Sequence, residues 1–103
     1  MQTIYKYELG RKNNAVIPVN MLHGAIVLHV DFDPAVEKFC VWAIVDTEEE
    51  ATEQRKFYIA DTGKDLSRDL MGTEELLQIN SFGFNDGMQF WFHGFEVVFA
   101  EPE

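Results

Sequence analysis

The segment from Phe39 to Gly63 most constrains how this chain can fold. It begins with the apolar run Phe39 to Val45 and continues through the acidic stretch 46–53. It then alternates basic, aromatic and aliphatic residues from Arg55 to Ala60. Two runs of this composition, separated by a polar connection, are typical of a β-hairpin. The segment therefore predicts a hairpin whose first strand, 39–45, is buried.

Further short segments with strand-like composition occur along the chain. They cover residues 4–9, 15–17, 25–33, 76–82 and 88–100. Pro18 cannot donate a ladder hydrogen bond, so it predicts a sheet edge or the end of a strand, and Gly94 predicts a bulge. The spacing of Leu66 and Leu70 is compatible with one short helical turn near residues 65–77. Together these features predict an all-β fold, a small antiparallel sandwich or barrel of six to seven strands.

The length of 103 residues predicts one all-β domain over residues 1–100 and a frayed acidic tail at 101–103. The chain is 47% hydrophobic, with nine Phe, which is enough for a core. No apolar run approaches the roughly 18 residues that cross a bilayer, so no membrane association is expected. Residues 1–8 lack the basic and apolar regions of a secretory signal, so we expect a cytoplasmic protein.

Catalytic and metal-binding motifs are missing from the sequence. The single cysteine, Cys40, lies in the apolar run and predicts a core thiol rather than a nucleophile. His23, His29 and His93 show no HxH or HExxH spacing and are expected at the surface. The segment 61–64 lacks the GxxxxGK[ST] pattern of a phosphate loop and predicts a turn. We therefore expect no cofactor, no metal and no enzymatic activity.

The formal net charge is −10, from 18 acidic and eight basic residues. This charge opposes nucleic-acid binding, since affinity for phosphates comes from Lys and Arg. It favours solubility, or alternatively the recognition of a protein with a basic surface. The candidate contacts for such a partner are Glu48, Glu49, Glu50 and Glu53.

Four aromatic residues alternate with predicted core positions: Tyr5, Tyr7, Tyr58 and Trp91. If they share one sheet face, they form a surface for a protein partner or for self-association, because Tyr and Trp are favoured anchors. The alternative is a core on both sides of a sheet. Both interpretations remain open from sequence alone.

Several short motifs resemble one known family in their order and spacing. They are Ile4–Leu9, Gly24–Val30, Val41–Asp46, the Arg55-Phe57-Ile59 alternation with Thr62-Gly63, and Phe90–Glu96. Across nearly the whole chain the sequence resembles a family of small bacteriophage-encoded proteins of uncharacterised function. It departs from that pattern at Asp61 and Lys64, where a Gly-Thr-Gly-His type turn is expected, and after Gly72. The resemblance implies a phage or prophage origin and transfers no catalytic residue.

These expectations favour a phage-encoded accessory protein that binds a protein with a basic surface. It would inhibit or modulate a host nucleic-acid-binding or defence protein. The first alternative is a virion or assembly component that forms homo-oligomers through Trp91 and the tyrosines. The second is a barrel that binds a small ligand at a mouth near His29 and His93.

Overall fold

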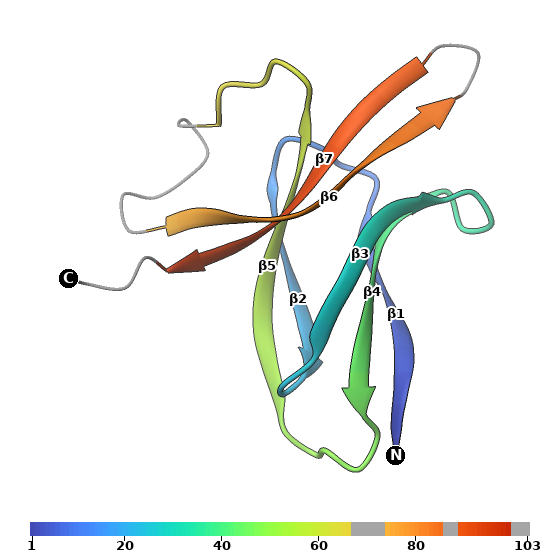
Figure 1. The fold of residues 1–103 in the computed structure, drawn as a ribbon, viewed down its shortest axis with the longest axis vertical. Coiled ribbons are helices and arrows are strands. Elements are labelled where there is room, and N and C mark those ends of the chain that lie inside the picture. Colours follow the sequence, from blue (N-terminus) through green and yellow to red (C-terminus); the bar gives the residue numbers. More distant parts are fainter. Residues whose placement is uncertain (67–73, 86–88, 100–103) are drawn as a thin grey trace.

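In the computed structural model, the described residues are 1–66, 74–85 and 89–99 (Figure 1). They form seven strands in two antiparallel sheets, which confirms the predicted all-β, sandwich-like fold. The strands are β1 (Gln2–Gly10), β2 (Val16–Leu22), β3 (Ile26–Asp33), β4 (Lys38–Asp46), β5 (Thr52–Asp61), β6 (Glu74–Asn85) and β7 (Gln89–Phe99).

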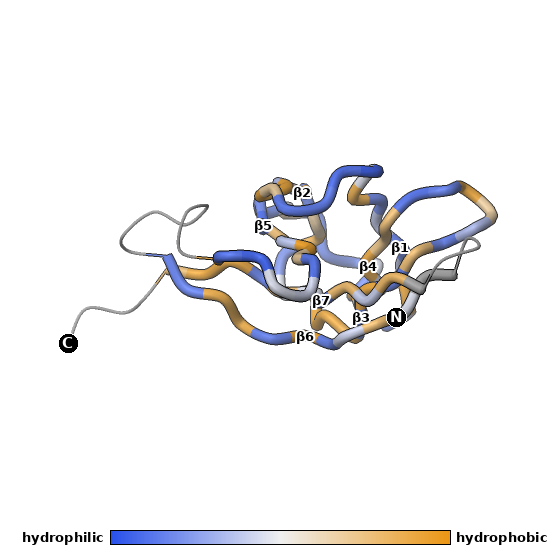
Figure 2. The backbone as a smooth tube through the Cα atoms, turned by 90° about the horizontal axis from the view of Figure 1, so that it is seen from above, coloured by the Kyte–Doolittle hydropathy of each residue, from blue (hydrophilic) through white to orange (hydrophobic). Residues whose placement is uncertain are grey.

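The strands are ordered β1-β4-β3 in a three-stranded sheet and β2-β5-β7-β6 in a four-stranded sheet. Pro18 lies on β2, which is an edge strand, as its missing N–H predicted. Figure 2 shows β2 and β5 on one side of the molecule and β1 and β4 on the other. The main core lies between these layers.

The predicted hairpin between residues 39 and 63 is wrong. β4 pairs with β1 and β3, whereas β5 pairs with β2 and β7, so their connection crosses from one sheet to the other. Both strands carry an inward apolar face, including Val41 on β4 and Phe57 on β5, and both side chains are fully buried. Placing the strands face to face buries both apolar surfaces in one core.

β3 approaches β6 and β7 closely at Val30. The side-chain amide of Asn80 on β6 accepts a hydrogen bond from the N–H of Val30 at 2.7 Å and donates one to its carbonyl at 2.9 Å. Asn80 is in register with Gly94, whose missing side chain leaves room for Val30. The bulge predicted at Gly94 is instead on β6, between Gln78 and Asn80, and β7 continues to Phe99.

The helical turn considered near residues 65–77 is absent from residues 74–77, which are part of β6. Residues 67–73 of that prediction lie outside the described residues, as does the tail 101–103.

Candidate functional site

The connection between β4 and β5 forms one end of the molecule, and we call residues 46–53 the acidic pole. Hydrogen bonds fix its backbone: Asp46 Oδ1 accepts from the N–H of Glu48, and Asp46 O accepts from the N–H of Glu49, both at 3.0 Å. The N–H of Thr47 donates to Met1 O at 2.9 Å. The Glu48 N–H also lowers the pKa of the Asp46 carboxyl, with a smaller contribution from the N-terminal ammonium. The pole is therefore an ordered loop with an ionised carboxylate at its base.

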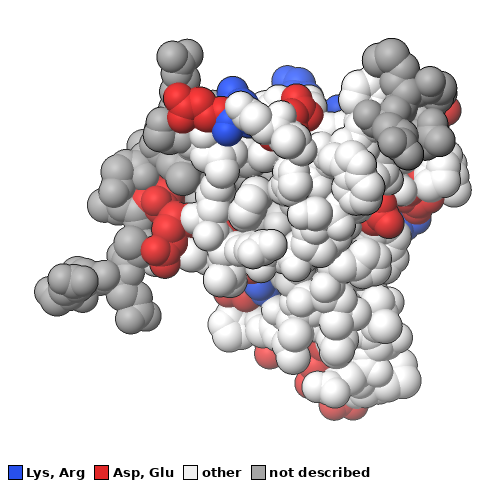
Figure 3. All heavy atoms as spheres, turned by 45° about the horizontal axis from the view of Figure 1, so that its top comes forward, with Lys and Arg blue, Asp and Glu red and all other residues white. Residues whose placement is uncertain are grey.

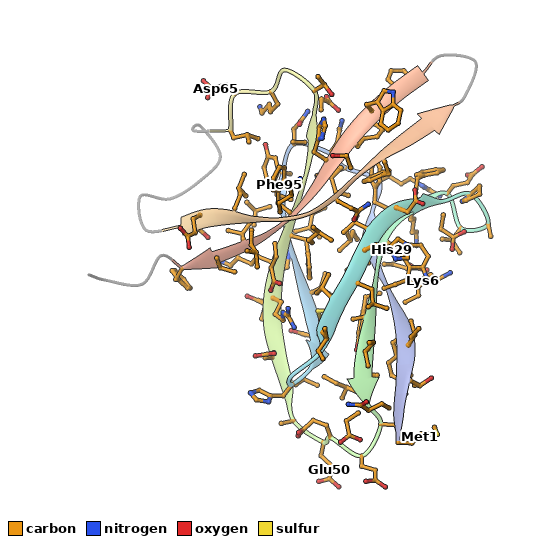
Figure 4. All side chains as sticks on the ribbon, viewed as in Figure 1. Met1, Lys6, His29, Glu50, Asp65 and Phe95 are labelled. Carbon is orange, nitrogen blue, oxygen red and sulfur yellow. The ribbon has the colours of Figure 1, made fainter. Side chains whose placement is uncertain are left out.

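The four glutamates predicted as partner contacts fall into two pairs. The Glu49 carboxylate accepts from the Ala51 N–H at 3.0 Å, and that of Glu53 accepts from the Gly24 N–H at 3.2 Å. Glu48 and Glu50 are exposed, and within the described residues their carboxylates have no hydrogen bond or ion pair. Figure 4 shows Glu50 at the far end of the molecule, pointing away from both sheets. Two of the four carboxylates are therefore available to a partner.

The four predicted aromatic contacts do not form one face. Tyr58 is 1% exposed and packs in a second cluster on the outer side of the four-stranded sheet, with Phe95 and Val97 among its members. Tyr7 is half-buried against the main core, and its neighbour Tyr5 is exposed. Trp91, 57% exposed, lies over Gly83 on the four-stranded sheet. The hypothesis of a common tyrosine and tryptophan surface is therefore wrong.

An exposed apolar surface that the sequence did not single out lies on the outer side of the three-stranded sheet. We call it the isoleucine face; its members are Ile4, Ile26, Leu28, Trp42 and Ile44. Ile4 and Ile26 lie directly opposite Ile44 on either side, and each is 57% exposed. One signal in the sequence was available: the run Phe39–Val45 does not alternate, which indicates apolar side chains on both faces of β4.

Trp42 was predicted in the core but lies on the isoleucine face. Its indole stacks on the His29 ring, with 4.7 Å between ring centroids and 4° between the planes. The register places both residues opposite each other, beside Lys6. Trp42 is consequently half-buried rather than enclosed between the sheets.

Two ion pairs cover the rest of that outer surface. Lys6 Nζ lies 2.6 Å from Asp33 Oδ2, and Lys38 Nζ lies 2.8 Å from Glu8 Oε2. The hydrogen bond from Lys6 lowers the pKa of Asp33, and that from Lys38 lowers the pKa of Glu8. Cys40 is fully buried beneath these side chains rather than in the main core, and burial raises the pKa of its thiol. Cys40 is thus a protected, protonated thiol.

His93 lies between two hydroxyl groups on the four-stranded sheet. Its Nδ1 is 2.7 Å from Ser81 Oγ and its Nε2 is 2.8 Å from Thr62 Oγ1. The ring borders an open pocket of about 220 Å³ that Lys64 also lines. Because both ring nitrogens are engaged, His93 is held as a structural group.

His29 belongs to the three-stranded sheet, where its ring stacks on Trp42, whereas His93 belongs to the four-stranded sheet. Among the described side chains, no group of three or more His, Cys, Asp and Glu is placed to hold a metal ion.

A largely buried ion pair, which no pattern in the sequence predicted, joins Arg55 and Glu96. Arg55 Nε and Nη2 each donate to Glu96 at 2.7 Å, and Arg55 Nη1 donates to the carbonyl of Ala25. Glu96 is only 8% exposed. The hydrogen bonds between Arg55 and Glu96 raise the pKa of Arg55 above its ordinary value. The pair links β5 and β7 to the start of β3, so its role is structural.

Comparison with known families places the whole chain, residues 1–103, in one family described as "Domain of unknown function (DUF7352)". The chain belongs to this family. No curated protein and no solved structure matches this DUF7352 member. The match agrees with the resemblance to an uncharacterised family. Over residues 1–66, 74–85 and 89–99, this DUF7352 domain has no helix of the length and apolar character that a membrane span requires.

Proposed function

We propose that this protein acts by binding a basic surface of another protein through its acidic pole. The observation that carries the proposal is the arrangement of Glu48 and Glu50 on a connection whose backbone is already fixed. Both carboxylates lack a partner among the described residues, and that of Glu50 projects from the end of the molecule (Figure 4). A preordered loop loses little conformational entropy when a partner binds, so such contacts favour affinity.

The charge of the whole chain supports the same function. A net charge of −10 attracts a basic partner over several ångströms and raises the association rate at low ionic strength. Figure 3 shows acidic residues in separate groups around a broad uncharged area. The local contacts at the pole would then fix where the partner docks.

The resemblance to phage-encoded proteins supports a more specific form of this proposal. The protein would be a phage-encoded accessory factor acting in the host cytosol. Its partner would be a host nucleic-acid-binding or defence protein, because surfaces that bind phosphates are rich in Lys and Arg. An acidic protein bound there would compete with the nucleic acid and act as an inhibitor.

The test is capture of a partner from host lysate by the tagged full chain at low and physiological salt. Replacing two exposed charges, E48Q with E50Q, should weaken binding of the captured protein about tenfold, since each exposed ion pair contributes roughly 0.2–1 kcal/mol. The control is E37Q with E75Q, which removes the same two charges from other exposed positions. No partner above background at either salt concentration, or equal weakening by the control, would refute the proposal.

A role as a virion or assembly component is the second candidate, and the isoleucine face favours it. Exposed apolar patches of this kind mark protein interaction surfaces. Detection of the protein in purified virions would support this role, and its absence from them would exclude it.

A further inference from the structure

We infer that the isoleucine face is the contact surface of a symmetric homodimer, a site separate from the acidic pole. The first evidence is the composition of β4. An antiparallel strand with one solvated face normally alternates apolar and polar residues. β4 instead directs Cys40, Trp42 and Ile44 outward, while Val41 and Ala43 face the core. Its outer face thus has the composition of a surface that another layer covers.

The neighbouring strands extend this apolar surface on both sides of β4. Ile4 on β1 and Ile26 on β3 lie opposite Ile44, which gives a row of three isoleucines across the sheet. Leu28, 41% exposed, lies next to the row, at a bulge between Val27 and His29. Burying such side chains removes apolar area from water, which favours association.

The charges on this face favour a second copy of the chain as the occupant. The lysines and most of the acidic groups there are already paired, Lys6 with Asp33 and Lys38 with Glu8. The face is therefore close to neutral on a chain with a net charge of −10. Two copies that meet here avoid the repulsion that any other acidic surface would impose. Among the described residues, the carboxylates of Asp33 and Glu8 on this face are already engaged by lysines and are not free for a strongly basic partner.

The isoleucine row is also self-complementary. Ile44 lies at its centre, between Ile4 and Ile26. A two-fold axis that lies in the interface and follows this row at Ile44 places the row of one copy on the same row of the other, with the two β4 strands antiparallel. Such an isologous contact is the commonest arrangement of homo-oligomers.

The size of the face predicts a weak dimer. Three strands about 4.8 Å apart, with about five residues of each in contact, give roughly 500 to 800 Å² of buried surface in total. Stable complexes bury about 1,200 Å² or more, so the dissociation constant should lie in the micromolar range.

Sedimentation velocity of the full chain, from about 10 to 500 μM, tests this inference over the range expected for a small interface. The wild-type protein should sediment increasingly as a dimer as its concentration rises. I26K should weaken dimerisation at least tenfold, because it buries a charge at the interface. L77K is the matched control: Leu77 is also 57% exposed, and the substitution changes the net charge equally, but it lies on the other sheet.

I4K is the second variant, in case I26K disturbs folding, and far-UV circular dichroism checks all three proteins. A monomer throughout the range for the wild type, or dimerisation that I26K and I4K leave intact while folded, overturns the inference. Equal loss of dimerisation in L77K overturns it as well.

Added salt should not weaken the dimer, whereas it should weaken binding at the acidic pole. E48Q with E50Q should leave sedimentation unchanged, so failure of one proposal does not imply failure of the other.

Discussion

Gly94 determines how closely β3 approaches β7. A Cβ atom built at this position lies 2.9 Å from Val30 Cβ, closer than packed carbon atoms approach. The Asn80 side chain holds the backbone of Val30 in place from the neighbouring strand. A single residue without a side chain thus permits one of the contacts that join the two sheets.

We predict that G94A destabilises the protein by about 1–3 kcal/mol, because Val30 is fully buried and cannot move without disturbing the core. G83A is the control: its Cβ would lie 3.6 Å from the Trp91 ring, an ordinary contact. It should change the free energy of unfolding by less than about 0.5 kcal/mol. Urea denaturation measures both. The steric explanation fails if G94A costs as much in a V30G background, which lacks the Val30 Cβ, as in the wild type.

The three-stranded sheet is held together on its outer side by charged groups as well as by its ladders. The Lys6 side chain extends from β1 across β4 to Asp33 on β3, and Lys38 on β4 pairs with Glu8 on β1. The pKa values of Asp33 and Glu8 are lowered from ordinary values of 3.8 and 4.5. Folding therefore favours the ionised form of both carboxyls.

This gives a prediction for acid stability. A lowered pKa contributes stability above the ordinary value, and that contribution is lost as the pH falls through the folded value. The melting temperature should therefore fall as the pH decreases from about 5 to about 3. K6M should reduce the slope of this decrease, whereas K12M removes a charge from an exposed lysine and should leave the slope unchanged. Equal slopes for K6M and the wild type in thermal melts would contradict the role of the Lys6–Asp33 pair.

At the scale of the whole molecule, the acidic side chains that give the net charge of −10 repel one another. Exposed ion pairs such as Met1–Asp46 and Arg11–Glu37 offset little of that repulsion. The Arg55–Glu96 pair differs from these, because it is largely buried and linked through the Ala25 carbonyl to the residue that precedes β3. Added salt screens both the repulsion and the surface ion pairs, and its net effect should be to stabilise the folded state.

We predict that raising the NaCl concentration from about 20 mM to about 300 mM increases the melting temperature by several degrees, because the Debye length falls from roughly 20 Å to roughly 6 Å and the repulsion between exposed carboxylates is screened. E48Q with E50Q should show a smaller increase, since it starts from a net charge two units less negative. Scanning calorimetry at a low protein concentration, where the monomer dominates, measures both. If the melting temperature of the wild type instead decreases as salt is added, the stabilisation by ion pairs outweighs the repulsion.

Much of the fold was predictable from the sequence because it depends on local patterns. Short runs of strand-like composition predicted the strands, Pro18 predicted the edge position of β2, and the acidic stretch predicted a polar connection. The same patterns did not distinguish a hairpin from a connection between sheets. A strand's periodicity encodes which side chains share a face, and it is identical whether its neighbour in sequence lies beside it or opposite it.

The sequence by itself determined that this chain forms β-strands with apolar faces and an excess of negative charge. Only the tertiary structure decided which faces are covered. Tyr58 is buried because Leu66, Phe95 and Val97 pack around it, whereas Ile4 and Ile26 stay exposed because nothing in the described part of the chain covers them. Burial depends on which distant segments of the chain pack together. The packing that forms is the one that lowers the free energy of the whole core, not of any single strand.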